Sequence, residues 1–83
     1  MIVGEIVTAH RTEGEERIRV LFGEVLEIAE IGVDDDFFEF GGHSLLAFRL
    51  IARIRAELGL ELDFDKLFDA PTAAGIARDL GLA

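Results

Sequence analysis

Ser44 is the only serine in the chain, and it is the residue best placed to do chemistry. It follows the two-glycine turn Gly41-Gly42 and one histidine, and it stands where an apolar-periodic helix begins. The positive end of a helix dipole and the free backbone N–H groups there favour a negatively charged group. A hydroxyl in this place therefore predicts an attachment point for a phosphate ester.

The chain offers few other groups for catalysis. A Ser-His-Asp triad needs a histidine that reaches the serine and a carboxylate that orients the histidine. His43 is the sequence neighbour of Ser44, and neighbouring side chains at a helix start usually point apart, while His10 lies near the start of the chain. The run around Ser44 is not a nucleophile elbow, and no strand is expected before it. The residues therefore disfavour a hydrolase.

The sequence predicts no metal site. Two distant histidines and no cysteine make a poor ligand set. Asp34, Asp35 and Asp36 are consecutive, but the EF-hand spacing of alternating oxygen ligands, a central glycine and a terminal glutamate is absent. We expect these aspartates to solvate a loop and to cap its turns.

Composition limits the class of protein. A chain of 83 residues predicts a single domain, and the absence of cysteine means no disulfide and no thiolate, which fits a cytoplasmic protein. Seventeen acidic against eight basic residues give a net charge of −9, which disfavours nucleic-acid binding and suits either solubility or partners with positive patches. No apolar run approaches the roughly 20 residues of a membrane span, and the start does not resemble a signal peptide. We expect a monomer that binds neither nucleic acid nor membranes.

Apolar residues at helical spacing predict an all-α fold, a four-helix bundle of three main helices and one short helix. Residues 1–12 are expected to be a flexible lead-in or linker, and residues 13–81 the folded domain. The first helix is predicted from Glu13 to Ala29, with Thr12 and Glu15 forming a capping box and Gly32 ending it. Its core face is expected to comprise Ile18, Leu21, Phe22, Val25 and Ala29.

A long loop, residues 32–43, is expected to lead into the second helix, with one helical turn at residues 37–40. The second helix is predicted from Ser44, as its cap, to Leu58, with Gly59 ending it. Leu45 and Phe48 fall off the apolar stripe and are predicted to be exposed contacts for partner proteins, although Phe48 could instead fold back on the loop. The stripe that should face the core comprises Leu46, Ala47, Leu50, Ile51, Ile54 and Leu58.

Two shorter helices complete the bundle. The third is predicted over Phe64–Asp69 with Asp63 as its cap, and Pro71 separates it from a last helix that Thr72 caps and that ends near Leu80. Gly75 inside this last helix should cost about 1 kcal/mol relative to alanine. The residues expected to face inward are Phe64, Leu67, Phe68, Ala73, Ile76, Ala77 and Leu80.

Three separate segments resemble a known family. The run Asp35-Asp36-Phe37-Phe38-Glu39-Phe40-Gly41-Gly42-His43-Ser44-Leu45-Leu46 is similar to the attachment motif of peptidyl carrier proteins, the thiolation domains of nonribosomal peptide synthetases. Arg49-Leu50-Ile51-Ala52-Arg53-Ile54 resembles the second helix of that family. Leu67-Phe68-Asp69-Ala70-Pro71-Thr72 resembles the stretch before its last helix. The resemblance covers about residues 11–80 of the chain and places it in the acyl-carrier-protein-like superfamily.

The resemblance implies a function. Ser44 would accept 4′-phosphopantetheine from coenzyme A through a separate phosphopantetheinyl transferase that uses magnesium, with Gly41, Gly42, His43 and Leu45 flanking the arm. An adenylation domain would load an aminoacyl group onto the thiol of the arm, and a condensation domain, a thioesterase or a tailoring enzyme would use it. The chain would then be a non-catalytic carrier.

Other functions stay open on the sequence. A near alternative is an acyl or aryl carrier of a polyketide, siderophore or fatty-acid pathway, although His43 and the double phenylalanine favour the peptidyl branch. A different class is a plain helical interaction module, in which Ser44 only caps a helix and no prosthetic group is attached. An enzyme would show turnover that depends on an unmodified Ser44.

Overall fold

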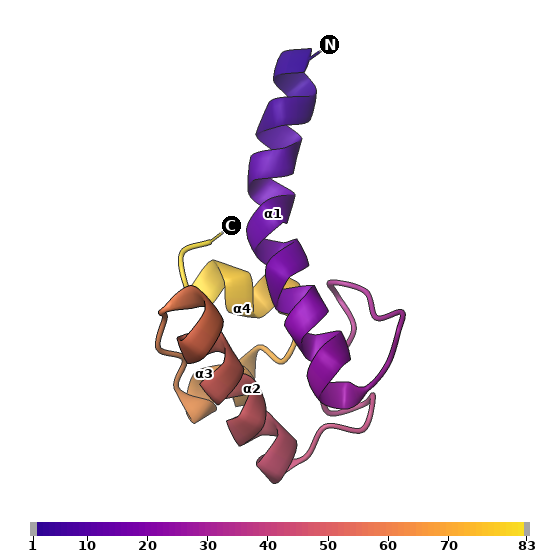
Figure 1. The fold of residues 1–83 in the computed structure, drawn as a ribbon, viewed down its shortest axis with the longest axis vertical. Helices are drawn as coiled ribbons and strands as arrows, with labels where there is room; N and C mark the ends of the chain where they lie inside the picture. The colour runs from indigo at the N-terminus through magenta and orange to yellow at the C-terminus, as the bar shows by residue number, and fades with distance from the viewer. Residues whose placement is uncertain (1, 83) are drawn as a thin grey trace.

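The computed structural model describes the backbone of residues 2–82 and the side chains of residues 13–82. Within these residues the chain forms four α-helices and no strand, which confirms the predicted all-α bundle. None of the four helices is both long enough and apolar enough to cross a membrane. The helices, labelled in Figure 1, are α1 (Ile2–Leu26), α2 (Ser44–Leu58), α3 (Phe64–Asp69) and α4 (Ala73–Asp79).

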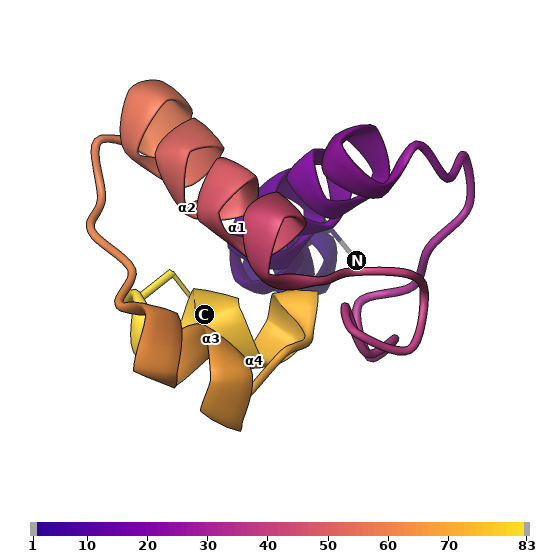
Figure 2. The same cartoon turned by 90° about the horizontal axis from the view of Figure 1, so that it is seen from below.

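The four helices surround one core. Helix α1 packs against α2 and α4, and the short α3 contacts both α2 and α4. The N-terminal part of α1 extends beyond the other three helices (Figure 1). Viewed from below, the connection from α1 to α2 passes along one side of the molecule before it reaches the start of α2 (Figure 2). This connection is the long loop that the sequence predicts.

Helix α1 differs from its prediction at both ends. It begins at Ile2 and not at Glu13, and no proline lies between these residues to interrupt it. Thr12 therefore lies inside the helix and is not its cap. Whether the first residues serve as a linker stays a prediction, and Met1 lies outside the described residues. The helix ends at Leu26, where Glu27 adopts a left-handed φ of 60°.

The end of α1 is closed by a local motif and not by Gly32. The N–H of Ile28 donates to the carbonyl of Gly23 at 2.9 Å, and the residue before Ile28, Glu27, is left-handed. This is the pattern of a Schellman motif. Glycine usually occupies this left-handed position, and a glutamate there is uncommon. The sequence therefore does not indicate that the helix ends at this point. Ala29, which the periodicity assigned to the core face, consequently lies beyond the helix and is exposed.

The core faces predicted for α1 and α2 are otherwise confirmed. The four remaining residues of the face predicted for α1 are buried, namely Ile18, Leu21, Phe22 and Val25. Helix α2 buries its stripe at Ala47, Leu50 and Ile54, and Leu46, Ile51 and Leu58 pack partly buried against the core. Gly59 ends α2 in the left-handed conformation, with φ 67°. The buried apolar residues are Ile18, Leu21, Phe22, Val25, Ile31, Phe37, Ala47, Leu50, Ile54, Leu62, Leu67, Ala73, Ile76 and Ala77.

The two short helices follow their predictions in part. The bounds of α3 are those expected, but the side chain of Asp63 makes no capping hydrogen bond. Thr72 caps α4 as predicted, since its Oγ1 accepts from the N–H of Gly75 at 3.0 Å. Helix α4 ends at Asp79, one residue before Leu80.

Gly75 proves to be a packing position. A Cβ built on it would lie 2.9 Å from the Cβ of Ala70 and 3.1 Å from Oγ1 of Thr72. Glycine therefore lets α4 approach the α3–α4 connection closely, which the sequence alone presents only as a weak point of the helix.

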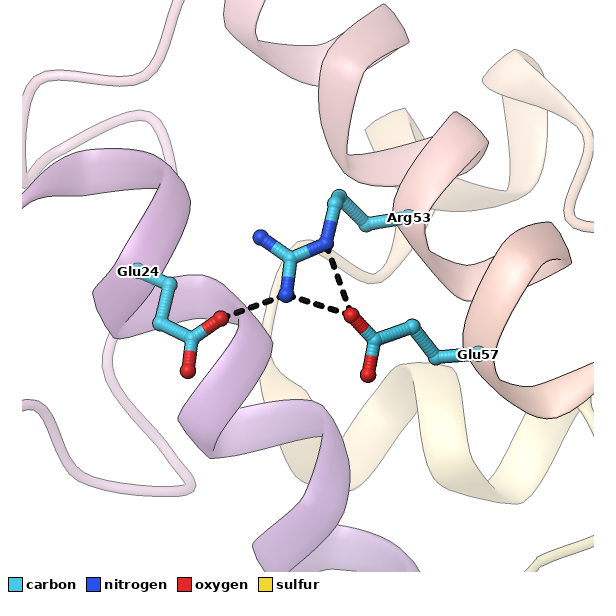
Figure 3. A network of polar contacts seen from close by, with 3 residues as sticks. All are labelled: Glu24, Arg53 and Glu57. Carbon is cyan, nitrogen blue, oxygen red and sulfur yellow. Dashed lines mark hydrogen bonds and ion pairs between the residues drawn. The ribbon is translucent and has the colours of Figure 1, made fainter.

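Arg53 joins α1 to α2 across their surface (Figure 3). Its Nη2 contacts Oε1 of Glu24 on α1 at 2.5 Å and Oε2 of Glu57, one turn along α2, at 2.6 Å. These hydrogen bonds, the one to Glu24 foremost, raise the pKa of Arg53. Arg53 therefore links the two helices through an ion pair at their surface.

Candidate functional site

The loop before Ser44 is ordered by its own aspartates. Oδ1 of Asp36 accepts from the N–H groups of Phe38 and Glu39 at 2.8 and 3.2 Å, and thereby caps the turn at residues 37–40. Oδ2 of Asp35 accepts from the N–H of Gly32 at 2.7 Å. These bonds confirm the expected capping role within the loop for Asp35 and Asp36.

Two backbone hydrogen bonds attach this loop to the other side of the bundle. The N–H of Phe37 donates to the carbonyl of Pro71 at 2.7 Å, and the N–H of Ala74 donates to the carbonyl of Val33 at 2.9 Å. Pro71 lies in the connection between α3 and α4, and Ala74 lies in the first turn of α4, so the loop is held against the start of that helix. The segment that leads to Ser44 thus has a defined position although it contains no long helix or strand.

The two glycines are required by geometry. Gly41 has φ 102°, a conformation that residues with a side chain rarely adopt, and a Cβ built on it would meet nothing within 4 Å. Gly42 has no room for a side chain, because a Cβ there would lie 2.5 Å from Cε2 of Phe37. The turn is therefore tight on its inner side at Gly42 and open on its outer side at Gly41.

Ser44 is the first residue of α2, and it is exposed. The cap position belongs to His43, whose backbone is extended at φ −145° and ψ −179° and whose carbonyl accepts the first helical bond, from Ala47, at 2.7 Å. The prediction that Ser44 caps α2 is therefore wrong by one residue. The side chain of His43 makes no capping hydrogen bond either.

The start of α2 can accept a negative charge. The first turn contains no acidic residue, and the first N–H groups of a helix have no carbonyl partner inside it. A phosphodiester on the hydroxyl of Ser44 would lie at the positive end of the helix dipole, with open space beside Gly41. The residues present therefore fit a phosphate ester at Ser44.

Comparisons with known proteins agree with this geometry. Residues 16–80 match the family model described as "Phosphopantetheine attachment site".

This chain belongs to the phosphopantetheine-attachment family.

The relatives of this carrier domain are parts of peptide-synthesising enzymes. It is 59% identical over 75 residues to a dimodular nonribosomal peptide synthase of Bacillus subtilis (strain 168), an alignment that covers 90% of this chain and 3% of that protein. The chain thus spans a small fraction of the length of that relative. These matches confirm that the carrier domain is of the peptidyl, or thiolation, type.

Solved structures confirm the fold. A structure of the phosphopantetheine transferase Sfp in complex with coenzyme A and a peptidyl carrier protein matches with a TM-score of 0.79 and 31% identity, covering 84% of this chain and 91% of that chain. A structure of McyG A-PCP complexed with phenylalanyl-adenylate matches with a TM-score of 0.75 and 35% identity, covering 82% of this chain and 11% of that chain.

An apolar surface lies beside Ser44 on the carrier domain. Leu45 is 63% exposed and Phe48 57% exposed, as predicted, and the ring of Phe48 lies 5.0 Å from that of Phe64 on α3. The ring of Phe48 thus rests against α3. Phe68 was predicted from the apolar spacing to face inward, and this prediction is wrong, because its side chain is 64% exposed. Its ring stacks on that of Phe64 with centroids 6.1 Å apart. We call this surface the α2–α3 patch; it comprises Leu45, Phe48, Phe64 and Phe68.

Phe68 is the member of this patch that sequence reasoning missed. In a helix of six residues, Phe64, Leu67 and Phe68 fall on the same side by spacing, and only Leu67 is fully buried. The ring of Phe38, from the loop, lies 5.3 Å from that of Phe68. No local signal distinguishes the buried position from the exposed one, because the neighbours that decide it come from distant parts of the chain.

Among the residues whose side chains the structure describes, no catalytic triad forms at Ser44. His43 precedes it in extended backbone and is exposed, and the side chain of His10 lies outside the described residues. Among the described residues, no group of three or more metal-ligating side chains gathers. Families of this kind act by carrying a group, and the chemistry is performed by other proteins.

Proposed function

We propose that Ser44 is the residue that receives 4′-phosphopantetheine, and that the chain carries aminoacyl or peptidyl groups in nonribosomal peptide biosynthesis. The observation that carries this proposal is the exposed hydroxyl of Ser44 at the first residue of α2, freed from capping because His43 occupies the cap. The same observation counts against a plain helical module in which Ser44 serves only as a cap.

In the proposed attachment, a phosphopantetheinyl transferase with magnesium brings coenzyme A to Ser44. Oγ of Ser44 forms a bond to the phosphorus that bears the pantetheine, the phosphoanhydride bond of coenzyme A breaks, and adenosine 3′,5′-bisphosphate leaves. The hydroxyl proton passes to a base of the transferase. When bound, the arm supplies a thiol, which this cysteine-free chain lacks, to hold the cargo as a thioester.

The chain's own residues present and orient the arm. Gly41 and Gly42 form the turn that leaves Ser44 accessible, and the start of α2 stabilises the negative charge of the phosphodiester. We propose that the chain has no turnover of its own. We further propose that residues 13–81 are the carrier domain, that residues 1–12 lead into it, and that it works in the cytoplasm, where coenzyme A is the donor.

We propose that the α2–α3 patch is where partner enzymes contact the carrier, with Leu45 and Phe48 as the main contacts. Both side chains are more than half exposed, and Leu45 is the neighbour of Ser44, so a protein that reaches the arm must pass over them. The partners proposed are the transferase, an adenylation domain, and a condensation domain, thioesterase or tailoring enzyme. An apolar patch of this kind on a strongly charged surface is typical of a protein contact.

The attachment is tested by intact mass spectrometry. The protein is incubated with coenzyme A, magnesium and a broad-specificity transferase, and Ser44→Ala is the control. A gain of one phosphopantetheine in the wild type alone would support the proposal. No gain, with a transferase that modifies another carrier in the same experiment, would refute it.

The cargo is tested on the modified protein. Loading by amino-acid-activating adenylation enzymes is the expected result, whereas loading only by fatty-acyl or aryl-activating enzymes would point to the acyl or aryl carrier alternative. The patch is tested with Phe48→Ala, which should slow loading without lowering stability markedly; Phe40→Ala, also partly exposed but outside the patch, is the matched control. Slow loading in both variants, or in neither, would exclude a specific role for the patch.

A further inference from the structure

Phe37 is a fully buried residue inside the loop that precedes Ser44. Its ring makes edge-to-face contacts with Phe22 of α1, at a centroid distance of 5.1 Å, and with Phe38, at 5.5 Å. Its backbone N–H donates to the carbonyl of Pro71 at 2.7 Å. Phe37 is therefore held from two sides, by α1 and by the connection between α3 and α4.

Gly42 lies directly on Phe37. The N–H of Gly42 donates to the carbonyl of Phe37 at 2.9 Å, and a Cβ on Gly42 would lie 2.5 Å from Cε2 and 2.6 Å from the carbonyl oxygen of Phe37. Such distances are shorter than van der Waals contact allows, so no side chain fits at position 42. The ring and the carbonyl group of Phe37 therefore fix the position of the Gly42 backbone.

The start of α2 has no side-chain bond of its own to hold it. His43, the single residue between Gly42 and Ser44, is extended and makes no capping hydrogen bond. The direction in which the chain enters α2, and with it the place of the Ser44 hydroxyl, therefore depends on where Gly42 lies. Other core residues stabilise the bundle, but Phe37 is the one on which this turn rests.

We propose that Phe37 is a positioning residue for phosphopantetheine transfer: through Gly42 it sets the place of the Ser44 hydroxyl in the complex with the transferase. This inference rests on the proposed function. In the transfer, Oγ of Ser44 forms the new bond to phosphorus while the phosphoanhydride bond breaks and the nucleotide leaves, so Oγ must lie in line with that bond. A misplacement on the order of 1 Å can slow such a step about a hundredfold.

The test compares Phe37→Leu with Phe22→Leu. Both positions are fully buried, both substitutions remove the same atoms, and the two rings contact each other. The three atoms nearest to a Cβ built on Gly42 all belong to Phe37. Transfer is followed with purified transferase and coenzyme A at a temperature where circular dichroism shows both variants folded. We expect kcat to fall about tenfold or more for Phe37→Leu and by a clearly smaller factor for Phe22→Leu, with KM for the carrier little changed in either. Phe22→Leu removes one of the two contacts that hold Phe37 but leaves the contact of Phe37 with Gly42 in place.

A second measurement separates position from stability. In ¹H–¹⁵N spectra, Phe37→Leu should shift the amide signals of Gly42, His43 and Ser44 by more than Phe22→Leu does. If Phe37→Leu does not fold, Phe37→Met, which keeps most of the volume, takes its place. Equal slowing in the Phe37 and Phe22 variants, or unmoved amide signals in the Phe37 variant, would overturn the inference.

The outcomes for the two proposals differ. A wild-type chain that the transferase never modifies would refute the proposed function. A wild-type chain modified at Ser44, with Phe37 and Phe22 variants that behave alike, would refute only the positioning role of Phe37.

Discussion

Replacing Gly75 with alanine sets helix propensity against packing. On propensity alone, Gly75→Ala in α4 should stabilise the protein by about 1 kcal/mol. The new methyl group, however, would lie 2.9 Å from the Cβ of Ala70 and 3.3 Å from its carbonyl oxygen. Forcing a methyl group into a packed place costs roughly 1–3 kcal/mol. It would also lie 3.1 Å from Oγ1 of Thr72, whose capping bond is worth about 1 kcal/mol.

We therefore expect the cost of overpacking to exceed the gain in helix propensity. Gly75→Ala should lower the free energy of unfolding by about 1 kcal/mol, which is the difference between these two contributions. In a domain of this size, that loss corresponds to a fall in Tm of about 4–8 °C. Urea and thermal unfolding followed by circular dichroism measure both quantities. Ala56→Gly, at an exposed position inside α2, measures the propensity term alone in the same protein. If Gly75→Ala stabilised the protein by as much as Ala56→Gly destabilised it, the reasoning would be refuted, because Ala70 would then have moved at no cost.

Three further changes test the polar contacts. Hydrogen bonds from Arg19 hold the pKa of Glu16 below its usual 4.5. The ionised carboxylate therefore stabilises the folded state at a pH above the unfolded pKa, and this contribution disappears as the pH falls through the folded pKa. In urea unfolding from about pH 5 downward, Glu16→Gln should lose less stability than the wild type. Asp36→Ala should lower the free energy of unfolding by about 1 kcal/mol and speed hydrogen exchange at the amides of Phe38 and Glu39, which Asp36 caps. Asp34→Ala, at an exposed position in the same loop, should do neither, and unchanged exchange in the Asp36 variant would contradict the capping role. Arg53→Gln should lower the urea midpoint at low salt and less so at high salt, since its ion pairs are exposed to solvent, and a difference that does not depend on salt would count against them.

The second helix could be predicted almost completely from the sequence. Leucine and isoleucine at four-residue spacing identify the face that α2 buries, and Gly59 marks its end, where the left-handed backbone is found. The same holds for Thr72, whose hydroxyl caps α4. These features depend on residues within one or two turns of each other, so short-range patterns are sufficient to predict them.

The start of α1 shows the limit of a local signal. Thr12 and Glu15 have the spacing of a capping box, but a cap is used only where the preceding chain leaves the helical conformation. The residues before Thr12 contain no proline, and the helix continues back to Ile2. A capping pattern therefore permits a helix to begin and does not require it.

The sequence was sufficient to identify Ser44 as the candidate site residue, but not to predict the geometry around it. Serine is a common cap, so the pattern assigned that role to Ser44, and the structure gives it to His43. The shift by one residue follows from the contact of Gly42 with Phe37 and from the bond of Phe37 to Pro71, which lies far along the chain. The exposure of Phe68 likewise depends on a distant neighbour, Phe38. The packing of Gly75 depends on Ala70, which is near in the sequence but is brought against α4 by the turn between α3 and α4.

The phenylalanine contacts have a consequence for spectroscopy. The chain contains no tryptophan and no tyrosine, and six of its seven phenylalanines form a continuous row from the surface at Phe48 to the core at Phe22. The near-ultraviolet circular dichroism of the protein must therefore arise from phenylalanine alone, and chiefly from this row. When a partner enzyme that contains tryptophan binds, all of the tryptophan fluorescence comes from the partner. Quenching or a spectral shift of that emission can then be followed against a dark background, with no label on either protein.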